Sequence, residues 1–160
     1  MIKTLISNWN HRVSSLDDVY ILGDFILNHT SENDALATLE ILKLLNGKKH
    51  IIPGNHDEKL WKYIQDNDFP VSCANTVIEN HVISYLQLGE IWPYGACLSH
   101  WRMDQWQNKG RNSLHLHGHC HSKNPVLPDI PRRVDVGVDA WNYTPVSINE
   151  IVDTVTNTCL

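Results

Sequence analysis

The sequence predicts an α/β protein in which two mixed β sheets form a sandwich with helices on the outside. A segment of helical periodicity at residues 35–45 separates two short predicted strands, at residues 19–22 and 48–52. A helix between two strands is typical of a parallel crossover. After residue 71 the pattern changes to short β-type segments between glycine and proline turns, which indicates further strands. The chain is therefore expected to form a single domain over residues 1–160.

The N-terminal half is expected to contain three helices. Apolar residues at steps of three and four predict an amphipathic helix over residues 5–13. Ser31 is a suitable N-cap for the second helix, and Asn46-Gly47 is a suitable stop for it. A third, shorter helix is expected over residues 58–66, before a break at residues 67–70.

The C-terminal half is expected to consist mostly of strands. They are predicted at residues 76–78, 82–85, 96–99, 114–117 and 134–138. The segment 101–113 contains two tryptophans and no clear period, so a covering loop is expected there. Three prolines predict an irregular segment at residues 122–131. For residues 146–152 the pattern leaves a strand and a short helix open.

Composition and charge exclude several classes of function. Hydrophobic residues make up 42% of the chain, which is enough for a packed core. The net charge is −5, and the longest basic runs are pairs such as Arg132-Arg133, so a stable nucleic-acid complex is not expected. No apolar run approaches the roughly 20 residues of a membrane span, and the N-terminus lacks the apolar stretch of a signal peptide. A cytoplasmic protein without membrane contact is therefore expected.

Cysteines and histidines are distributed differently along the chain. The four cysteines lack the C-x-x-C spacing of metal or redox motifs, so they are expected to be reduced thiols: Cys73, Cys97, Cys120 and Cys159. Ten histidines are many for this length. Six of them fall at or near predicted strand ends: His56, His100, His115, His117, His119 and His121. Such clustering is typical of a metal site.

Four apolar runs end in side chains that can bind a metal. In chain order these ends are Gly23-Asp24, Gly54-Asn55-His56-Asp57, His100 and Gly118-His119-Cys120-His121. In open α/β sheets, ligands gather outside the carboxyl ends of the strands. The four ends therefore predict one shared site.

This ordered set resembles the signature of the calcineurin-like metallophosphoesterases, in particular their small single-domain bacterial and phage members. Gly-Asp alone is common, Gly-Asn-His-Asp is more specific, and the four motifs in order are a strong match. The similarity covers nearly the whole chain, including the ending at residues 136–143. It implies the αββα sandwich of the metallophosphatases and a metal-dependent phosphoesterase activity.

One part of that family's pattern is absent from the 160 residues. The family begins with a strand that ends in Asp-x-His, but the sequence contains no Asp-x-His, and residues 1–10 resemble the middle of the family's first helix. The chain is therefore expected to be N-terminally truncated, without the first strand and two metal ligands. That loss is expected to expose backbone groups of residues 19–22 and 48–52, and so to favour low stability or self-association through a sheet edge.

The resemblance implies two metal ions that share a bridging aspartate. Asp24 would be the bridging carboxylate, and Asn55, His100 and His119 would complete one ion. His121 would belong to the other ion, whose remaining ligands are those of the missing motif. Carboxylate, amide oxygen and imidazole suit manganese first, with iron, zinc and nickel as alternatives.

The neighbours of these ligands have expected roles as well. The resemblance implies that His56 lies near the leaving oxygen and acts as the proton donor. Asp57 is expected to shape its turn or to orient an imidazole. His115 and His117 are expected to be packed or to lie behind the ligands, and Cys120 is expected to point away from them.

Three further positions could line a substrate mouth, although covering loops in general have this composition: Trp101, Arg102 and Trp106. The family's layout also implies that Asp139 and Asn142 lie near the site, and direct contact with it is not expected for either.

The leading hypothesis is a metal-dependent phosphoesterase for phosphodiesters or phosphomonoesters of small or nucleotide-like substrates. Acidic charge and the lack of a second domain favour small substrates over polymers. Two alternatives stay open: a non-catalytic metal-binding relative, and a truncated reading frame of an active phosphoesterase. With one metal site incomplete, weak or no turnover is expected.

Overall fold

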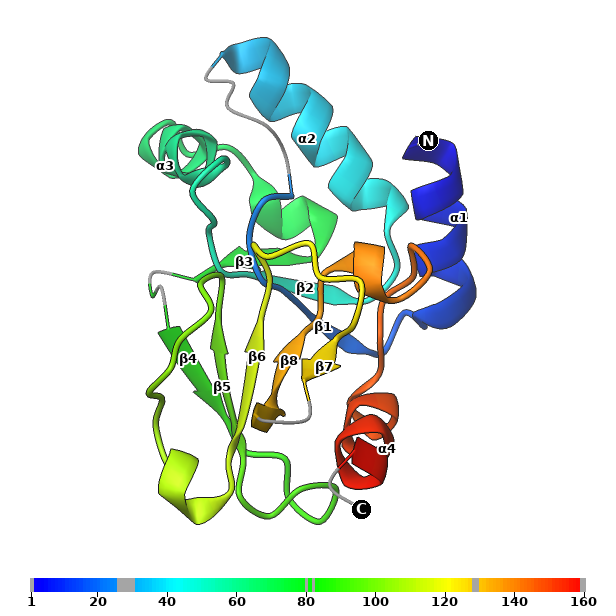
Figure 1. The fold of residues 1–160 in the computed structure, drawn as a ribbon. Helices are drawn as coiled ribbons and strands as arrows, with labels where there is room; N and C mark the ends of the chain where they lie inside the picture. Colours follow the sequence, from blue (N-terminus) through cyan, green and yellow to red (C-terminus); the bar gives the residue numbers. More distant parts are fainter. Residues whose placement is uncertain (1, 26–30, 80, 82, 128–129, 159–160) are drawn as a thin grey trace. The chain divides into compact units, whose positions relative to one another are not determined.

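The computed structural model describes residues 2–25, 31–79, 81, 83–127 and 130–158, and the chain divides into two compact units. Unit 1 is Met1–Val82 and unit 2 is Ile83–Leu160, and each is described by itself. The predicted α/β class is confirmed, because unit 1 contains a parallel sheet, unit 2 a mixed sheet, and helices flank both (Figure 1). The single phosphoesterase domain stays a prediction.

Unit 1 alternates helices and short strands. In chain order its elements are α1 (Ile2–Arg12), β1 (Asp18–Ile21), α2 (Glu32–Leu44), β2 (Lys48–Ile51), α3 (Glu58–Asp66), the 3-10 helix η1 (Val71–Ala74) and β3 (Thr76–Ile78). The strands form a parallel sheet in the order β1-β2-β3. The parallel crossover from β1 through α2 to β2 is therefore confirmed.

The central strand of this sheet is β2. It pairs with β1, in a register that aligns Ile21 with Ile51, and with β3 on its other side. The predicted exposure of backbone groups along residues 48–52 is therefore wrong, because β1 pairs directly with β2. Within the described part of unit 1, the edge strands of this sheet are β1 and β3.

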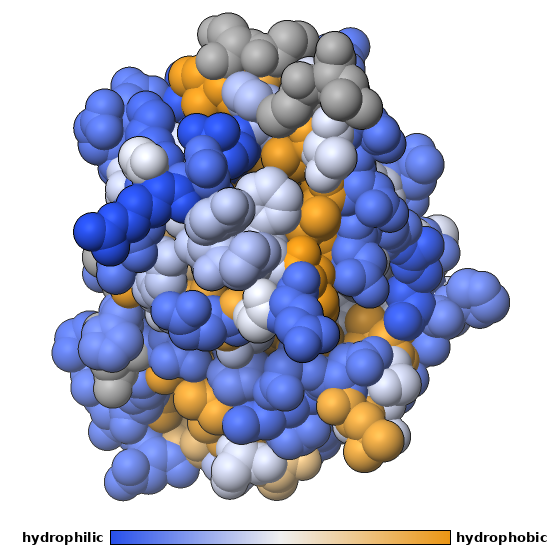
Figure 2. All heavy atoms as spheres, turned by 90° about the horizontal axis from the view of Figure 1, so that it is seen from below, coloured by the Kyte–Doolittle hydropathy of each residue, from blue (hydrophilic) through white to orange (hydrophobic). Residues whose placement is uncertain are grey.

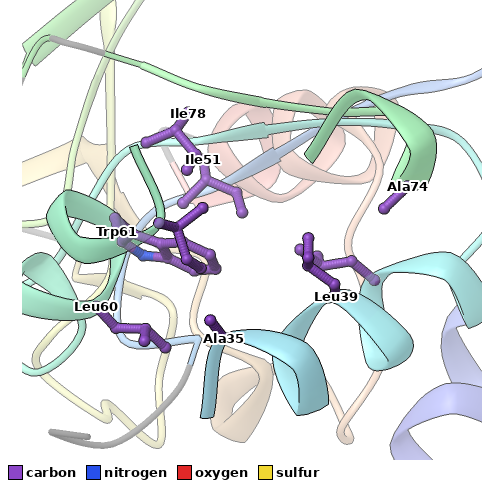
Figure 3. Close-up of a cluster of buried hydrophobic side chains, with 9 residues drawn as sticks. Ala35, Leu39, Ile51, Leu60, Trp61, Ala74 and Ile78 are labelled. Carbon is purple, nitrogen blue, oxygen red and sulfur yellow. The ribbon is translucent and has the colours of Figure 1, made fainter. Parts of the chain in front are cut away.

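The core of unit 1 lies where α2 and α3 pack on the sheet (Figure 3). Ala35, Leu39 and Leu42 follow the helical period and form the buried face of α2. Trp61 of α3 is almost completely buried against Ile51 and its neighbours in this cluster. Burial of such large apolar side chains contributes about 1.5–3 kcal/mol each, so this cluster holds the two helices on the sheet.

The ends of α2 agree with the sequence signals. Ser31 adopts an extended conformation, and its side chain accepts a hydrogen bond from the backbone N–H of Asp34, so the predicted N-cap is confirmed. At the other end, Gly47 has a φ of +83°, and a Cβ atom there would lie 2.8 Å from the carbonyl oxygen of Asp17. A side chain at residue 47 would therefore prevent the tight turn into β2.

Unit 2 is built mainly from strands. In chain order its elements are β4 (Ile83–Leu86), β5 (Ala96–Ser99), η2 (Lys109–Arg111), β6 (Leu114–His117), β7 (Val126–Leu127), β8 (Ile130–Asp135), η3 (Val138–Ala140) and α4 (Ile148–Thr158). The sheet order is β4-β5-β6-β8-β7, with β5, β6 and β8 parallel and the two edge strands antiparallel. Helix α4 packs against β7 and β8.

Two expectations for unit 2 change, and the structure decides one alternative that the sequence leaves open. The last strand was placed at residues 134–138, but β8 is Ile130–Asp135, because the chain turns where the Asp135 carboxylate accepts a hydrogen bond from Gly137 N–H. The segment 122–131 is not wholly irregular, since β7 and the start of β8 lie in it. Residues 146–152 contribute to a helix, since Ser147 and Glu150 form a reciprocal capping box at the start of α4.

The surface carries isolated apolar side chains among polar ones. Figure 2 shows one face on which hydrophilic residues predominate and hydrophobic residues remain visible between them. None of the helices described here is long and apolar enough to cross a membrane. Cys73, Cys97 and Cys120 are free thiols, as expected, whereas Cys159 lies outside the described residues.

Candidate functional site

In unit 1, two of the predicted motifs lie at adjacent strand ends. The backbone N–H of Ile52 donates to the carbonyl of Ile21 at 2.9 Å, which extends the pairing of β1 and β2 to their carboxyl ends. Because the two strands are parallel, Gly23-Asp24 and the loop of residues 54–57 leave the sheet at the same edge. The parallel register therefore brings these two motifs together.

Asp24 is attached directly to the second motif. Gly23 and Asp24 have φ values of 83° and 55°, so two successive residues with positive φ turn the chain sharply after β1. The Asp24 carboxylate accepts a hydrogen bond from the backbone N–H of His56 at 3.0 Å. The predicted bridging carboxylate is thus held at the tip of the second loop.

Asp57 is the buried anchor of both loops. Its side chain is 0% exposed and accepts hydrogen bonds from Gly54 N–H at 2.7 Å and from Phe25 N–H at 2.8 Å. Burial raises the pKa of this carboxyl, and the two backbone donors act to lower it. The indole N–H of Trp61 also acts to lower the pKa, although it lies outside hydrogen-bond geometry. Of the two roles expected for Asp57, the structure shows the shaping of the turn.

The two other predicted residues of unit 1, Asn55 and His56, have exposed side chains on the same loop. Two hydrogen bonds hold the backbone of this loop: Gly54 N–H donates to the Asp57 carboxylate, and His56 N–H donates to the Asp24 carboxylate. Both side chains can therefore reach a ligand from a rigid loop, and their roles as metal ligand and proton donor stay predictions.

In unit 2, the ends of β5 and β6 bring two predicted ligands together. The register aligns Ser99 with His117, and Gly118 N–H donates to the carbonyl of His100. His100 is buried, and its Nε2 lies 3.1 Å from Nδ1 of the exposed His119. Two nitrogens that each bind one ion at about 2.1 Å lie roughly 3.0–3.4 Å apart. The pair therefore has a spacing at which both rings can bind the same ion.

The loop after β6 has an uncommon backbone. His119 and His121 have φ values of 66° and 48°, on either side of Cys120. The left-handed region is disfavoured for residues with a side chain, and residues that adopt it occur in tight turns and cluster at functional sites. The same two residues are the ones that the sequence predicts as ligands.

His121 is paired with a residue for which no direct contact with the site was expected. Its Nδ1 lies 2.5 Å from Oδ2 of Asp139, which belongs to η3 after β8. The sequence signal for Asp139 was available, because this carboxylate directly follows the strand predicted at residues 134–138. His121 and Asp139 form the second pair of metal-capable side chains in unit 2.

The two remaining strand histidines are packed, as expected. His115 is fully buried; its Nε2 accepts a hydrogen bond from Met103 N–H and its Nδ1 donates to the carbonyl of Cys97, so it is neutral. Burial lowers the pKa of His115 to about 4. Burial also lowers the pKa of His117, whose Nδ1 donates to the carbonyl of Gly118.

The tryptophans of the 101–113 loop differ in position. Trp101 is 46% exposed, and its ring centroid lies 4.4 Å from that of His119. Trp106 is buried, donates its indole N–H to Ser113 and stacks on His115. The expectation of a substrate mouth that includes Trp106 is therefore wrong, whereas Trp101 and the exposed Arg102 stay candidates.

Comparison with known proteins finds relatives without an assigned function. No protein-family model matches the chain. The Gene 66 protein of a Mycobacterium phage is 28% identical over 151 residues, which are 84% of this chain and 73% of that protein. The crystal structure of AQ665, a protein of unknown function from Aquifex aeolicus, shares the fold with a TM-score of 0.68 and 21% identity, over 95% of this chain and 83% of that one.

A more similar relative is the uncharacterized protein MJ1445 of Methanocaldococcus jannaschii. It is 31% identical over 158 residues, which are 95% of this chain and 73% of that protein. A similarity of this extent covers both units. The chain therefore belongs to the family of uncharacterized proteins that includes MJ1445.

Proposed function

We propose that this protein is a metal-dependent phosphoesterase that hydrolyses phosphodiester or phosphomonoester bonds of small or nucleotide-like substrates. The observation that carries the proposal is the pair of imidazole nitrogens of His100 and His119, 3.1 Å apart at the ends of two parallel strands. Both residues match motif positions of the calcineurin-like metallophosphoesterases that the sequence resembles. The αββα sandwich of that family is part of the same proposal.

The donor set suits a divalent ion. Asp24 and Asn55 of unit 1 offer oxygen ligands, and His100 and His119 of unit 2 offer nitrogen ligands, a mixture that manganese, iron, zinc and nickel accept. That these ligands share one ion, and that His121 belongs to a second, rests on the order of the motifs in the sequence. A bound ion of this kind supplies Lewis acidity toward phosphoryl oxygens.

The proposal gives His56 the proton transfer to the leaving oxygen. Its imidazole is exposed on a loop that Asp57 holds at Gly54 N–H, and its own backbone N–H donates to Asp24. A ring N–H on such a rigid loop can be aimed at a substrate oxygen with little loss of entropy. This geometry supports His56 as the general acid of the reaction.

Metal analysis of the purified protein tests the ligand set. We expect one manganese ion to bind with clearly higher affinity than a second, because Asp24, Asn55, His100 and His119 are the complete set. His119→Ala is expected to lose the tight ion, whereas the control His11→Ala, on the exposed surface of α1, should retain it. Two ions held equally tightly, or an unchanged affinity in His119→Ala, would contradict the assignment.

Hydrolysis of a bis-aryl phosphodiester with saturating manganese tests the activity. We expect weak turnover that falls by about 10²–10³-fold in His56→Ala. Fusion of an N-terminal strand that ends in Asp-x-His should raise turnover by a similar factor, since it supplies the missing motif.

The second candidate is a non-catalytic relative that binds one metal ion through the same residues, Asp24, Asn55, His100 and His119. Tight manganese binding without turnover, in both the original and the extended chain, would support this candidate against the enzyme. Turnover that depends on His56 would support the enzyme.

A further inference from the structure

We infer that Asp139 is a positioning residue: its carboxylate fixes the orientation and the tautomer of the His121 imidazole. The inference deepens the proposed function, on which the metal-binding role of His121 rests. The starting observation is the short contact of 2.5 Å between His121 Nδ1 and Asp139 Oδ2. Both residues belong to unit 2 but come from different loops, after β6 and after β8.

A buried aspartate at the end of β8 brings these two loops together. Asp135 is 2% exposed, and its carboxylate accepts hydrogen bonds from Ser122 N–H at 3.0 Å and from Gly137 N–H at 2.9 Å. Ser122 directly follows His121, and Gly137 lies two residues before Asp139. The relative position of His121 and Asp139 is therefore set by a buried group and not by the exposed pair itself.

The turn that carries Asp139 is rigid for further reasons. The indole N–H of Trp141 donates to the carbonyl of Asp135 at 2.8 Å, and Tyr143 N–H donates to the carbonyl of Val138 at 2.8 Å. A Cβ atom on Gly137 would lie 3.0 Å from Oδ1 of Asp135, so a glycine fits this turn best. Asp139 is thus held in place before any ligand binds.

An ordinary surface ion pair would not need this support. Exposed pairs contribute little to stability, and the side chains of His121 and Asp139 are 74% and 39% exposed. Yet His121 adopts a φ of 48°, which is disfavoured for a histidine, in a loop that ends on the Asp135 anchor. The role of this arrangement is therefore to orient the His121 imidazole and not to increase the stability of the fold.

The carboxylate has a defined effect on the ring. A proton on Nδ1 that donates to Asp139 leaves the lone pair of the neutral imidazole on Nε2, which is the atom that can then bind a metal. Carboxylate partners of this kind orient metal-binding histidines and make them more basic, and their removal commonly lowers metal affinity 10–100-fold. Asp139 would act in this way on the weaker metal position.

Three variants separate positioning from folding. Asp139→Ala removes the acceptor, Asp139→Asn keeps an acceptor oxygen without the charge, and Asp153→Asn changes an exposed aspartate on α4 as a control. The first readout is the nitrogen NMR spectrum of His121 in the metal-free protein at a pH of about 8, where an ordinary imidazole is neutral. The second is the affinity of the weaker manganese position, measured by calorimetric titration.

We expect the Nδ1–H tautomer of His121 in the unchanged protein, in Asp139→Asn and in the control. Asp139→Ala should shift the ring to a mixture of tautomers and weaken the second manganese 10–100-fold, with a smaller loss in Asp139→Asn. An unchanged tautomer in Asp139→Ala, or an equal loss of affinity in the Asp153→Asn control, would overturn the inference. A tautomer shift without any manganese binding would support the positioning role of Asp139 and contradict the proposed function.

Discussion

Both units use a buried aspartate to join two loops at the carboxyl ends of their strands, but the loops present different groups. In unit 1, Asp57 accepts N–H groups from the loops after β1 and β2; in unit 2, Asp135 accepts N–H groups from the loops after β6 and β8. The loop joined by Asp57 presents exposed single side chains, such as His56. The loops joined by Asp135 present a paired imidazole, His121 with Asp139. The same kind of anchor can thus hold loops that present separate side chains or a hydrogen-bonded pair of side chains.

The largest expected effect is the loss of either anchor. Asp57→Ala and Asp135→Ala should each lower the free energy of unfolding by about 3–5 kcal/mol, because each leaves two backbone N–H groups, buried or partly buried, without their acceptor. Urea denaturation measures the loss. Asp66→Ala and Asp153→Ala, which change exposed aspartates on α3 and α4, serve as controls and should change it little. A small effect at only one anchor would show that the two units are not built alike.

Acid should destabilise the fold through unit 2. His115 has a folded-state pKa of about 4, below that of the unfolded chain, so the unfolded chain binds its proton first as the pH falls. The contribution of His115 to the free energy of unfolding should therefore fall between a pH of about 6.5 and 4, by about 3 kcal/mol. Urea denaturation across this range measures it, and His115→Gln should give a flatter dependence.

In unit 1, Asp57 changes the free energy of unfolding with pH in the opposite direction. Because burial raises the pKa of its carboxyl, the folded state takes up this proton before the unfolded chain does, and this contribution to stability increases as the pH falls. Comparison of Asp57→Asn with His115→Gln over the same range separates the two contributions. A flat dependence in the unchanged protein that becomes steep in Asp57→Asn would show that the two groups compensate.

The smallest expected effect concerns Trp101. Its exposed ring lies beside His119 and offers a stacking surface for an aromatic group of a substrate. Trp101→Ala should lower kcat/KM for an aryl phosphodiester about 10-fold and leave an alkyl phosphodiester little changed, since stacking contributes about 1–3 kcal/mol. Trp101→Phe should keep most of the preference. An equal loss in the control Tyr94→Ala, another exposed aromatic of unit 2, would remove Trp101 from the proposed substrate contacts.

Much of the fold could be predicted from local signals. Helix α3 and strands β3, β5 and β6 have the predicted bounds, because strong apolar runs there end at clear turn residues. The start of α4 was left open because the apolar run at residues 146–152 suits both element types, although the Ser147-x-x-Glu150 capping box favours a helix. The ends of β8 differ because prolines at residues 125–131 suggest an irregular segment, yet Pro131 fits within β8.

The candidate site could be predicted only in part. The proximity of His100 and His119 follows from two parallel strands that end together, and this is visible in the sequence. The pairing of His121 with Asp139 depends on a left-handed residue and on the turn at Gly137, which strand patterns do not encode. Trp101 is exposed and Trp106 is buried because of the path of their loop, whose sequence shows no hydrophobic period that would predict it.

The left-handed residues have a consequence for the evolution of this surface. Asp24, His119 and His121 all have positive φ, a conformation that costs about 1–2 kcal/mol per residue with a Cβ atom and that glycine adopts freely. A change of any of these residues to glycine relieves the backbone while it deletes the carboxylate or the imidazole. The backbone conformation alone would therefore favour glycine at these three positions, against the hydrogen bonds that the side chains of Asp24 and His121 make.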